Sequence, residues 1–248
     1  VFIPGTERLV AMVGWRQTTA ILGLLLLVAG GSTALFALPK RSVRPDPGRP
    51  SLSMSGSLRS LVRDRRFRLY TLAMMLSFFV AQGVLSHRVA LFGEAGFPVA
   101  AVALWAAVAS ALSLPGRWLA PLVAIRLRAT KVQAATIAMV AAATLLMVDG
   151  RDSWQMIGHF VLFGLGFGAL LPLRAMVMAE WYSGSDYGRI LGAQWTAVGL
   201  AGAAGPVIVG VVRDQTGGYG IPMAVLAAIY LTVVALILLA GTERHTTI

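Results

Sequence analysis

The sequence lacks cysteine altogether, which excludes disulfide bonds and thiolate-held metal sites. Charge is also scarce: 12% of the 248 residues are charged, where soluble proteins carry about 25%. With 57% hydrophobic residues, this scarcity excludes an ordinary soluble domain and predicts an integral membrane protein. We expect no secretory signal peptide before the first apolar run. Because the chain begins at Val1 within such a run, we expect it to be a fragment whose N-terminal part is missing.

Acidic residues are the rarest charged class, with 10 Asp and Glu against 21 Lys and Arg. They stand almost entirely in links between apolar runs or at helix ends, and no nucleophile–base pair or metal-ligand cluster appears. We therefore expect no enzymatic activity, no cofactor and no metal site. The basic excess would suggest nucleic acid in a soluble protein, but here the bases lie in links, so we expect a lipid bilayer and no nucleic acid as partner.

What the chain does contain is long apolar runs, which predict an all-α membrane protein of about seven transmembrane helices plus an N-terminal stub. A helix of roughly 20 residues crosses about 30 Å of hydrocarbon. The predicted spans are 17–38, 68–92, 97–122, 132–148, 154–181, 188–212 and 219–240, after a stub over 1–15. Residues 183–186 link the fifth and sixth spans, and a tail begins at Gly241.

A linker over 39–67 is rich in proline, serine and arginine, and contains Lys40 and Arg41 among its bases. Basic links favour the cytoplasmic side. If 39–67 is cytoplasmic, alternation places 123–131, 182–188 and the C-terminus there too, and the opposite links carry at most one base each. The pattern predicts a multi-pass protein of the plasma membrane, with bacterial inner membrane favoured.

Arg174 is the first candidate functional residue, because a charge well inside an apolar span is costly and usually faces protein or water. Helical steps of about 100° place Phe163, Phe167 and Met178 near its face. That combination predicts a cavity lining for an anionic or amphipathic solute. The alternative is that Arg174 extends towards the inner membrane surface or binds a helix C-terminus.

Further polar candidates lie in other spans. His87 follows Gln82 in the outer half of its span. Because histidine can bind and release a proton, His87 is a candidate for carrying a coupling proton or binding a carboxylate, or else lies in a watery vestibule beside Arg88. Gln194 either binds a solute or links two helices. His159 lies about 22 Å along a helix from Arg174 and is expected at the membrane interface. Gly164 and Gly168 are expected to pack helices, since no strand precedes them as a phosphate loop requires.

Several short motifs together resemble the major facilitator superfamily, in its monocarboxylate and oxalate/formate-like branch. The resemblance covers the whole chain. It rests on the order and spacing of the motifs together, because no single motif is specific. Gly116 and Arg117, followed by Arg126, resemble the loop between helices eight and nine. Other matching positions are Pro4, Gly14-Trp15-Arg16, Pro172-Leu173-Arg174, Ala179-Glu180-Trp181, Gly188 to Gly192, Gly205-Pro206, Gly210, Asp214 and Gly217 to Tyr219.

The resemblance implies a twelve-helix secondary transporter of two halves, in which a small organic solute crosses between the halves by alternating access. Residues 1–38 would end the N-terminal half, 39–67 would be the central cytoplasmic loop, and 68–248 would form the six-helix C-terminal half. A partner is then implied, namely the missing N-terminal half. Ile125 and Pro121 stand where the family usually has Asp and Gly, which implies a weak inner latch in this half.

Three hypotheses stay open at this point. The first is transport of an organic anion such as a monocarboxylate, driven by protons or by exchange, with Arg174, His87, Gln82, Gln194 and Phe167 as solute-binding residues. The second is export of drug-like compounds or metabolites by the same fold. The third is a truncated fragment that is inactive without its other half. In each, Gly116, Arg117, Arg126, Gly205 and Pro206 are expected to serve gating or structure.

Overall fold

The computed structural model describes residues 2–33, 61–182 and 187–242, and these residues form α-helices joined by short turns, with no strand among them. Six of the helices are long and apolar enough to cross a membrane. The predicted all-α, multi-pass membrane architecture is therefore confirmed at that level. The larger part of the predicted linker, the link at 183–186 and the tail from 243 lie outside the described residues.

The chain divides into two units, Val1–Ser53 and Met54–Ile248. The described part of the first unit is α1 (Phe2–Ser32), within which Leu9–Ser32 is apolar enough to span a membrane. Gly14 interrupts the helical conformation with φ 79° and ψ 163°, a region that favours glycine. The predicted stub and first span thus correspond to two helical segments, which the kink at Gly14 separates.

The described residues of the second unit start with a helical turn at residues 61–63, and six longer helices follow among them. Their bounds are α3 (Arg65–Glu94), α4 (Val99–Arg126), α5 (Ala129–Leu145), α6 (Ser153–Trp181), α7 (Tyr187–Thr216) and α8 (Gly220–Thr242). Two begin at acidic caps. The Asp64 carboxylate accepts a bond from the backbone N–H of Arg66, and Asp152 forms a reciprocal capping box with Gln155. These caps fix where the spans start after their polar links.

The span predicted over 132–148 corresponds to α5, which has the predicted length of 17 residues but lies three residues earlier, at Ala129–Leu145, and gives way to turns before Asp149. It is shorter than the six helices that are long enough to cross a membrane. Apolar residues 146–148 follow without a break, so hydropathy could not mark where the helix ends. At 1.5 Å per residue, α5 is about 25 Å long.

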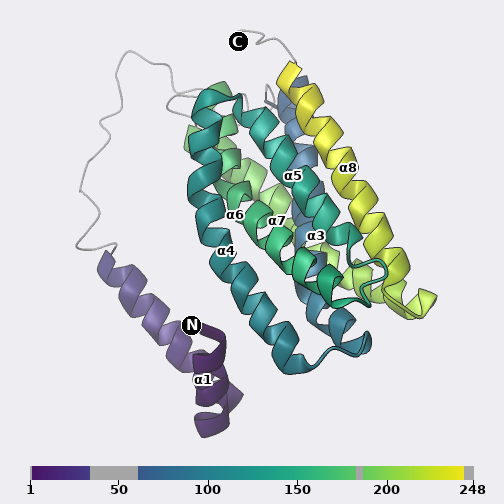
Figure 1. Cartoon of the computed structure of the whole chain (residues 1–248). Coiled ribbons are helices and arrows are strands. Elements are labelled where there is room, and N and C mark those ends of the chain that lie inside the picture. The colour runs from purple at the N-terminus through teal and green to yellow at the C-terminus, as the bar shows by residue number, and fades with distance from the viewer. Residues whose placement is uncertain (1, 34–60, 183–186, 243–248) are drawn as a thin grey trace. The chain divides into compact units, whose positions relative to one another are not determined.

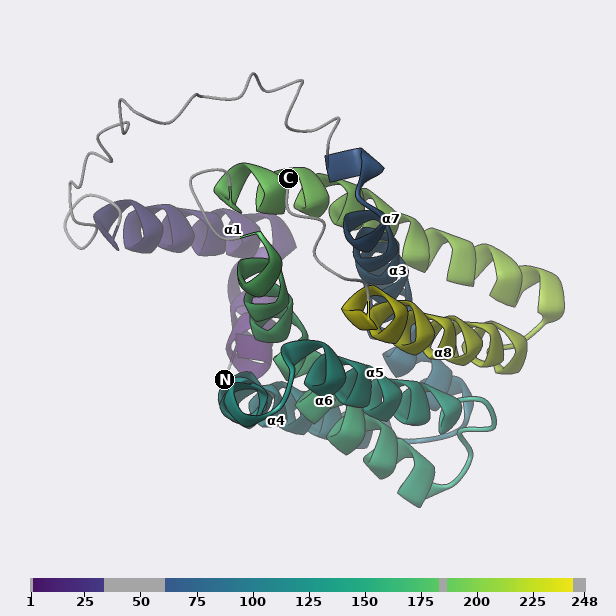
Figure 2. The same cartoon turned by 90° about the horizontal axis from the view of Figure 1, so that it is seen from above.

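The packing of the second unit repeats itself after three helices. Consecutive helices run in opposite directions (Figure 1), so the triplet α6–α8 starts from the membrane side opposite to that of α3–α5. The main contacts of α3 are with α7 and α8, those of α6 are with α4 and α5, and α5 packs on α8. Exchanging the two triplets leaves this contact pattern unchanged. Seen end-on, α3 and α8 lie between α7 and the group of α4, α5 and α6 (Figure 2).

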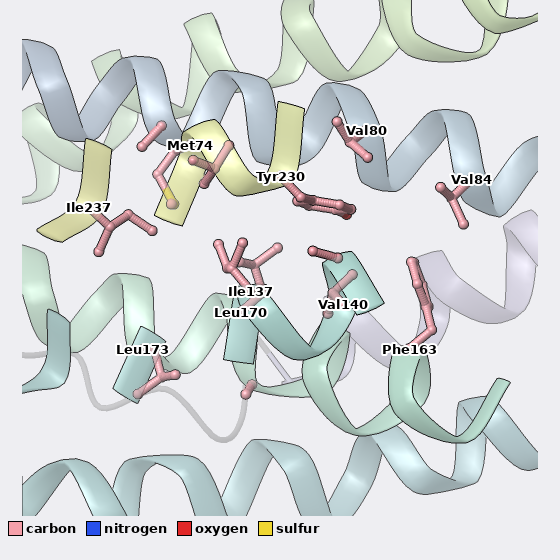
Figure 3. Packing of buried hydrophobic residues seen from close by; sticks show 14 of the residues in the cluster. Met74, Val80, Val84, Ile137, Val140, Phe163, Leu170, Leu173, Tyr230 and Ile237 are labelled. Atoms are coloured by element: carbon pink, nitrogen blue, oxygen red, sulfur yellow. The ribbon is translucent and has the colours of Figure 1, made fainter. Parts of the chain in front are cut away.

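The apolar core lies where α3, α5, α6 and α8 meet (Figure 3). Met74 and Val80 of α3, Ile137 of α5, Leu170 of α6 and Tyr230 of α8 are all essentially inaccessible. By contrast, α4 and α7 are mostly exposed and flank the core. Lipid can cover those apolar outer faces, since no aqueous penalty applies to them inside a bilayer.

Glycines set the closest helix contacts in both triplets. A Cβ at Gly205 of α7 would overlap the carbonyl oxygen of Phe79 in α3, and a Cβ at Gly168 of α6 would overlap that of Ser113 in α4. A Cβ at Gly164 would lie 2.5 Å from the carbonyl oxygen of Ala109. The interpretation of Gly164 and Gly168 as packing residues is confirmed. Small residues let the two backbones approach where lipid supplies no hydrophobic drive.

Candidate functional site

Arg174 lies on α6 with its side chain 5% exposed, joined to α7 by two hydrogen bonds. Its Nε donates to Oε1 of Gln194 at 2.9 Å, and Nη2 donates to the carbonyl oxygen of Leu191 at 3.2 Å. The guanidinium also lies 4.7 Å from the ring centroid of Trp195. Two residues that the sequence singled out separately, Arg174 and Gln194, therefore lie in one cluster.

This cluster closes a junction between helices that otherwise barely touch, since α6 and α7 share few contacts. The amide nitrogen of Gln194 donates onward to the hydroxyl of Thr71 on α3 at 3.3 Å. One chain of polar groups thus connects α6, α7 and α3. Arg174 is seven residues from the end of α6, so the chain lies about 10 Å inside that end.

The predicted aromatic cavity face around Arg174 is not seen as predicted. Phe163 and Met178 are fully buried in the core, and Phe167 is half-buried and stacked on Phe163 with centroids 5.4 Å apart. Hydropathy cannot separate a core face from a cavity face on a helix that is apolar all round. Phe167 is also seven residues, about 10 Å, from Arg174 along α6, so the two do not form one contact site.

A second polar cluster ties the helix ends near Arg174. The hydroxyl of Tyr182 donates to Oδ2 of Asp64 at 2.5 Å, and the Arg66 guanidinium lies 3.8 Å from the ring centroid of Trp181. Arg66 also donates from Nε to the carbonyl oxygen of Ala240, so α3, α6 and α8 are joined. Burial, and then the bond to Asp64, raise the pKa of Tyr182 above its usual value.

His87 lies at the opposite end of the bundle and links α3 to α7. Its Nε2 lies 2.9 Å from the carbonyl oxygen of Pro206, and its Nδ1 lies 3.2 Å from the hydroxyl of Tyr219. A carbonyl can only accept, so Nε2 carries the proton and Nδ1 is free to accept from Tyr219. His87 and Arg174 therefore belong to different clusters at the two ends of α3 and α6.

Ionic contacts surround the His87 cluster. Arg213 of α7 contacts Oε1 of Glu94 in α3 at 2.5 Å and Asp214 at 3.0 Å, and its guanidinium lies 5.5 Å from the ring of Tyr219. Partial burial, together with the nearby Glu94 charge, raises the pKa of Tyr219. A cavity of about 510 Å³ adjoins this cluster. It is lined by Leu91, Glu94, Ala95, Met147, Val148, Asp149, Arg151 and Gly218 to Gly220.

The remaining predicted residues are spread over the surface and the packing contacts. Gln82 is exposed on α3, beside Gly202. Gly116 is buried, and a Cβ there would overlap the carbonyl oxygen of Leu165, whereas Arg117 and Arg126 are exposed along α4. Gly205 packs on Phe79, and Pro206 supplies the carbonyl that His87 binds. These residues thus do not converge on the Arg174 cluster.

The expectation that His159 is an interfacial side chain is wrong. It is fully buried, with Nδ1 2.9 Å from the carbonyl oxygen of Ala143 in α5 and with its ring against Phe92, Phe160 and Phe163. Arg88 of α3 packs over the same Phe160 and Phe163 rings, at 5.2 and 5.6 Å. Sequence spacing along one helix could not show that a histidine of α6 and an arginine of α3 pack on the same two rings.

The described residues contain no group of three or more His, Asp or Glu side chains placed to hold a metal ion. What the two polar ends offer instead is hydrogen bonding and positive charge inside an apolar bundle. No family model matches the sequence, and no curated protein matches it.

Proposed function

We propose that this protein is a secondary transporter of the major facilitator type, moving a small organic solute across the membrane by alternating access. The observation that carries the proposal is the Arg174–Gln194 bond. It holds a charged side chain within an apolar span, at a helix junction with few other contacts. Charges at such depth mark pathways more often than they serve stability.

Two further features support this function. The packing of α3–α5 is repeated by α6–α8 with the opposite direction through the membrane, and inverted repeats underlie alternating access in many transporters. The polar clusters around Arg174 and His87 also lie at opposite ends of the bundle, as gates on two sides require. The resemblance of the sequence motifs points to the same superfamily.

Positive side chains favour an organic anion, such as a monocarboxylate, as the solute, with coupling to protons or exchange. Arg174 meets the solute when its bonds to Gln194 and Leu191 are exchanged for solute oxygens as α6 and α7 separate. In this proposal that end and the C-terminus face the cytoplasm of a bacterial cell, which is supported by the basic links at the Arg174 end, including Arg126, Arg128 and Lys131. The N-terminal half of the transporter completes the pathway.

The test is flux of radiolabelled lactate in vesicles that contain the purified transporter with both of its halves. We expect uptake above that of protein-free vesicles, loss of most of it in Arg174→Ala, and partial recovery in Arg174→Lys. Arg68→Ala is the matched control, since Arg68 is an exposed arginine in the first turn of α3. Uptake equal to that of protein-free vesicles contradicts transport of this anion. Uptake unchanged by Arg174→Ala removes Arg174 from the mechanism.

A further inference from the structure

We propose that Arg88 and His159 form a binding site for a small 2-hydroxy carboxylate, in which the guanidinium binds the carboxylate and the imidazole accepts the hydrogen bond of the hydroxyl. The proposal takes the ligand to be the solute of the proposed transporter. It concerns a pair of side chains other than the Arg174 cluster, and its binding is measurable without transport.

Arg88 is a cation without a counter-ion. No described acidic side chain forms an ion pair with it, and its Nε is buried without a hydrogen-bond partner. Its recorded contacts are with the faces of Phe160 and Phe163. It lies six residues, about 9 Å, inside the end of α3 at Glu94. A guanidinium at this depth is costly unless an anion pairs with it, and its planar fork matches a carboxylate.

Arg174 and Arg88 differ in whether the guanidinium is already hydrogen-bonded to the protein, and this decides which of them can bind a carboxylate. Arg174 is 5% exposed, and its bonds to Gln194 and Leu191 join it to α7. Arg88 is half-buried. Its Nε is buried without a hydrogen-bond partner, but its two terminal nitrogens are not buried in this way. A carboxylate can therefore reach Arg88 in the conformation seen, whereas Arg174 must first give up its protein partners.

His159 supplies the second, complementary atom. Its Nδ1 lies 2.9 Å from a backbone carbonyl oxygen, which can only accept, so Nδ1 carries the proton and Nε2 presents a lone pair. Nε2 is buried and has no partner among the described residues. An unpaired buried polar atom is destabilising, so a donor at this position is favoured. A neutral imidazole of this tautomer accepts a hydrogen bond from a hydroxyl at Nε2. A second carboxylate oxygen could not bind there, because it has no proton to donate.

The two side chains share one aromatic wall. The His159 ring lies 5.1 Å from Phe160 and 5.4 Å from Phe163, the same two rings that Arg88 covers. The imidazole lies between Ala143 of α5 and Phe92 of α3, and Phe92 is one turn from Arg88. Figure 3 shows Phe163 of α6 and Val84 of α3 pointing toward one another, and Val84 lies one turn before Arg88. The pair thus bridges α3 and α6.

A 2-hydroxy carboxylate matches this pair because it carries an anionic group and a hydroxyl donor on adjacent carbons. The carboxylate binds the terminal nitrogens of Arg88 from the accessible side. The hydroxyl donates to Nε2 of His159, the atom that is left without a partner. The apolar remainder of the solute rests on the phenylalanine rings.

The experiment is equilibrium binding of radiolabelled lactate to the purified protein in detergent, with propionate and lactamide as competitors. Propionate lacks the hydroxyl and lactamide lacks the charge. We expect lactate to bind more tightly than propionate by about three- to tenfold, the size of one neutral hydrogen bond, and lactamide to compete at least tenfold more weakly than lactate.

Variants divide the two contributions. Arg88→Gln is expected to weaken lactate binding at least tenfold, Arg88→Lys less, and Arg68→Gln not at all, although it removes the same charge from the same helix. His159→Phe is expected to bind lactate no better than propionate, whereas His159→Gln keeps an acceptor and part of the preference. Size-exclusion profiles and unfolding temperatures identify variants that fail to fold.

Three results overturn the proposal. These are a wild-type protein that does not bind lactate at millimolar concentrations, an Arg88→Gln variant that folds and binds lactate normally, or a preference for lactate over propionate that survives in folded His159→Phe. Lactate binding that depends on Arg88 without any flux in vesicles upholds the site and contradicts the transport function. Flux that is indifferent to Arg88→Gln contradicts the site alone.

Discussion

The guanidinium of Arg174 donates to the side-chain amide of Gln194 across the junction of α6 and α7, at 2.9 Å and out of contact with solvent. The hydrogen bond from this charged group is therefore accepted by an amide oxygen rather than by a carboxylate. A charged donor bound to a neutral acceptor is easier to separate than a buried ion pair, because no opposite charge is left behind. That suits a junction that must open and close.

Replacing Gln194 by leucine tests the stabilising part of this relationship. Gln194→Leu leaves Nε of Arg174 buried without an acceptor, so we expect the free energy of unfolding to fall by about 1–3 kcal/mol. Gln82→Leu is the control, since Gln82 is exposed on α3 and should change stability by less than about 0.5 kcal/mol. Denaturant or thermal unfolding in one detergent measures both. Equal losses in the two variants would show that Gln194 does not support Arg174.

The close approach of α3 and α7 predicts opposite effects for two glycines of α7. A Cβ at Gly205 overlaps the backbone of Phe79, so Gly205→Ala should cost about 1–3 kcal/mol as the helices move apart. Gly199 has no neighbouring atom within 4 Å, so Gly199→Ala should leave stability unchanged or raise it by about 0.5–1 kcal/mol. Unfolding midpoints of the two variants decide this, and a neutral Gly205→Ala would contradict the packing.

The Tyr182–Asp64 hydrogen bond predicts a dependence of stability on alkaline pH. Burial and the bond to Asp64 raise the pKa of Tyr182 in the folded state, so the native protein holds this proton more tightly than the unfolded chain does. The stabilisation is complete below the unfolded value of about 10 and is lost as pH rises beyond it. We expect the midpoint temperature of wild type to fall more steeply above about pH 10 than that of Tyr182→Phe. Parallel curves would show that Tyr182 does not contribute.

The Arg213–Glu94 ion pair joins α7 to α3 at the end where His87 lies. Both side chains are substantially exposed, so we expect Glu94→Gln to change the unfolding midpoint little. Its effect should appear in transport, because salt screens the same contact. Lactate flux should respond to Glu94→Gln and to raised ionic strength in the same direction, and the variant should lose most of its response to salt. A variant with the full response of wild type to salt would exclude this pair as the cause.

The span boundaries were largely predictable, because run length and polar punctuation determine them. The predicted 68–92, 154–181 and 188–212 correspond to α3, α6 and α7 within a few residues. What could not be predicted was whether each face of a helix packs on another helix, and on which one, or faces lipid. Helices that meet both lipid and one another are apolar all round, so neither the burial of Phe163 nor the encounter of His159 with the rings beneath Arg88 follows from periodicity.

The candidate site shows the same division. Arg174 and Gln194 were conspicuous as polar residues in apolar runs, and they do bind each other. The sequence did not single out Trp195, Thr71 or Tyr219, because aromatic and hydroxyl side chains are common in any span. Only their contacts with residues of other helices show that they belong to the clusters.

The 17 residues of α5 have a consequence for the surrounding lipid. A helix of about 25 Å is shorter than a typical hydrocarbon layer of about 30 Å, and α5 is anchored between α6 and α8, so it is not free to shift towards either surface. A bilayer accommodates so short a span by thinning beside it, which would bring headgroups closer to Asp149 and Arg151. Phospholipids with shorter tails relieve that deformation, so the thickness of the host membrane becomes one of the variables that set how easily this bundle changes shape.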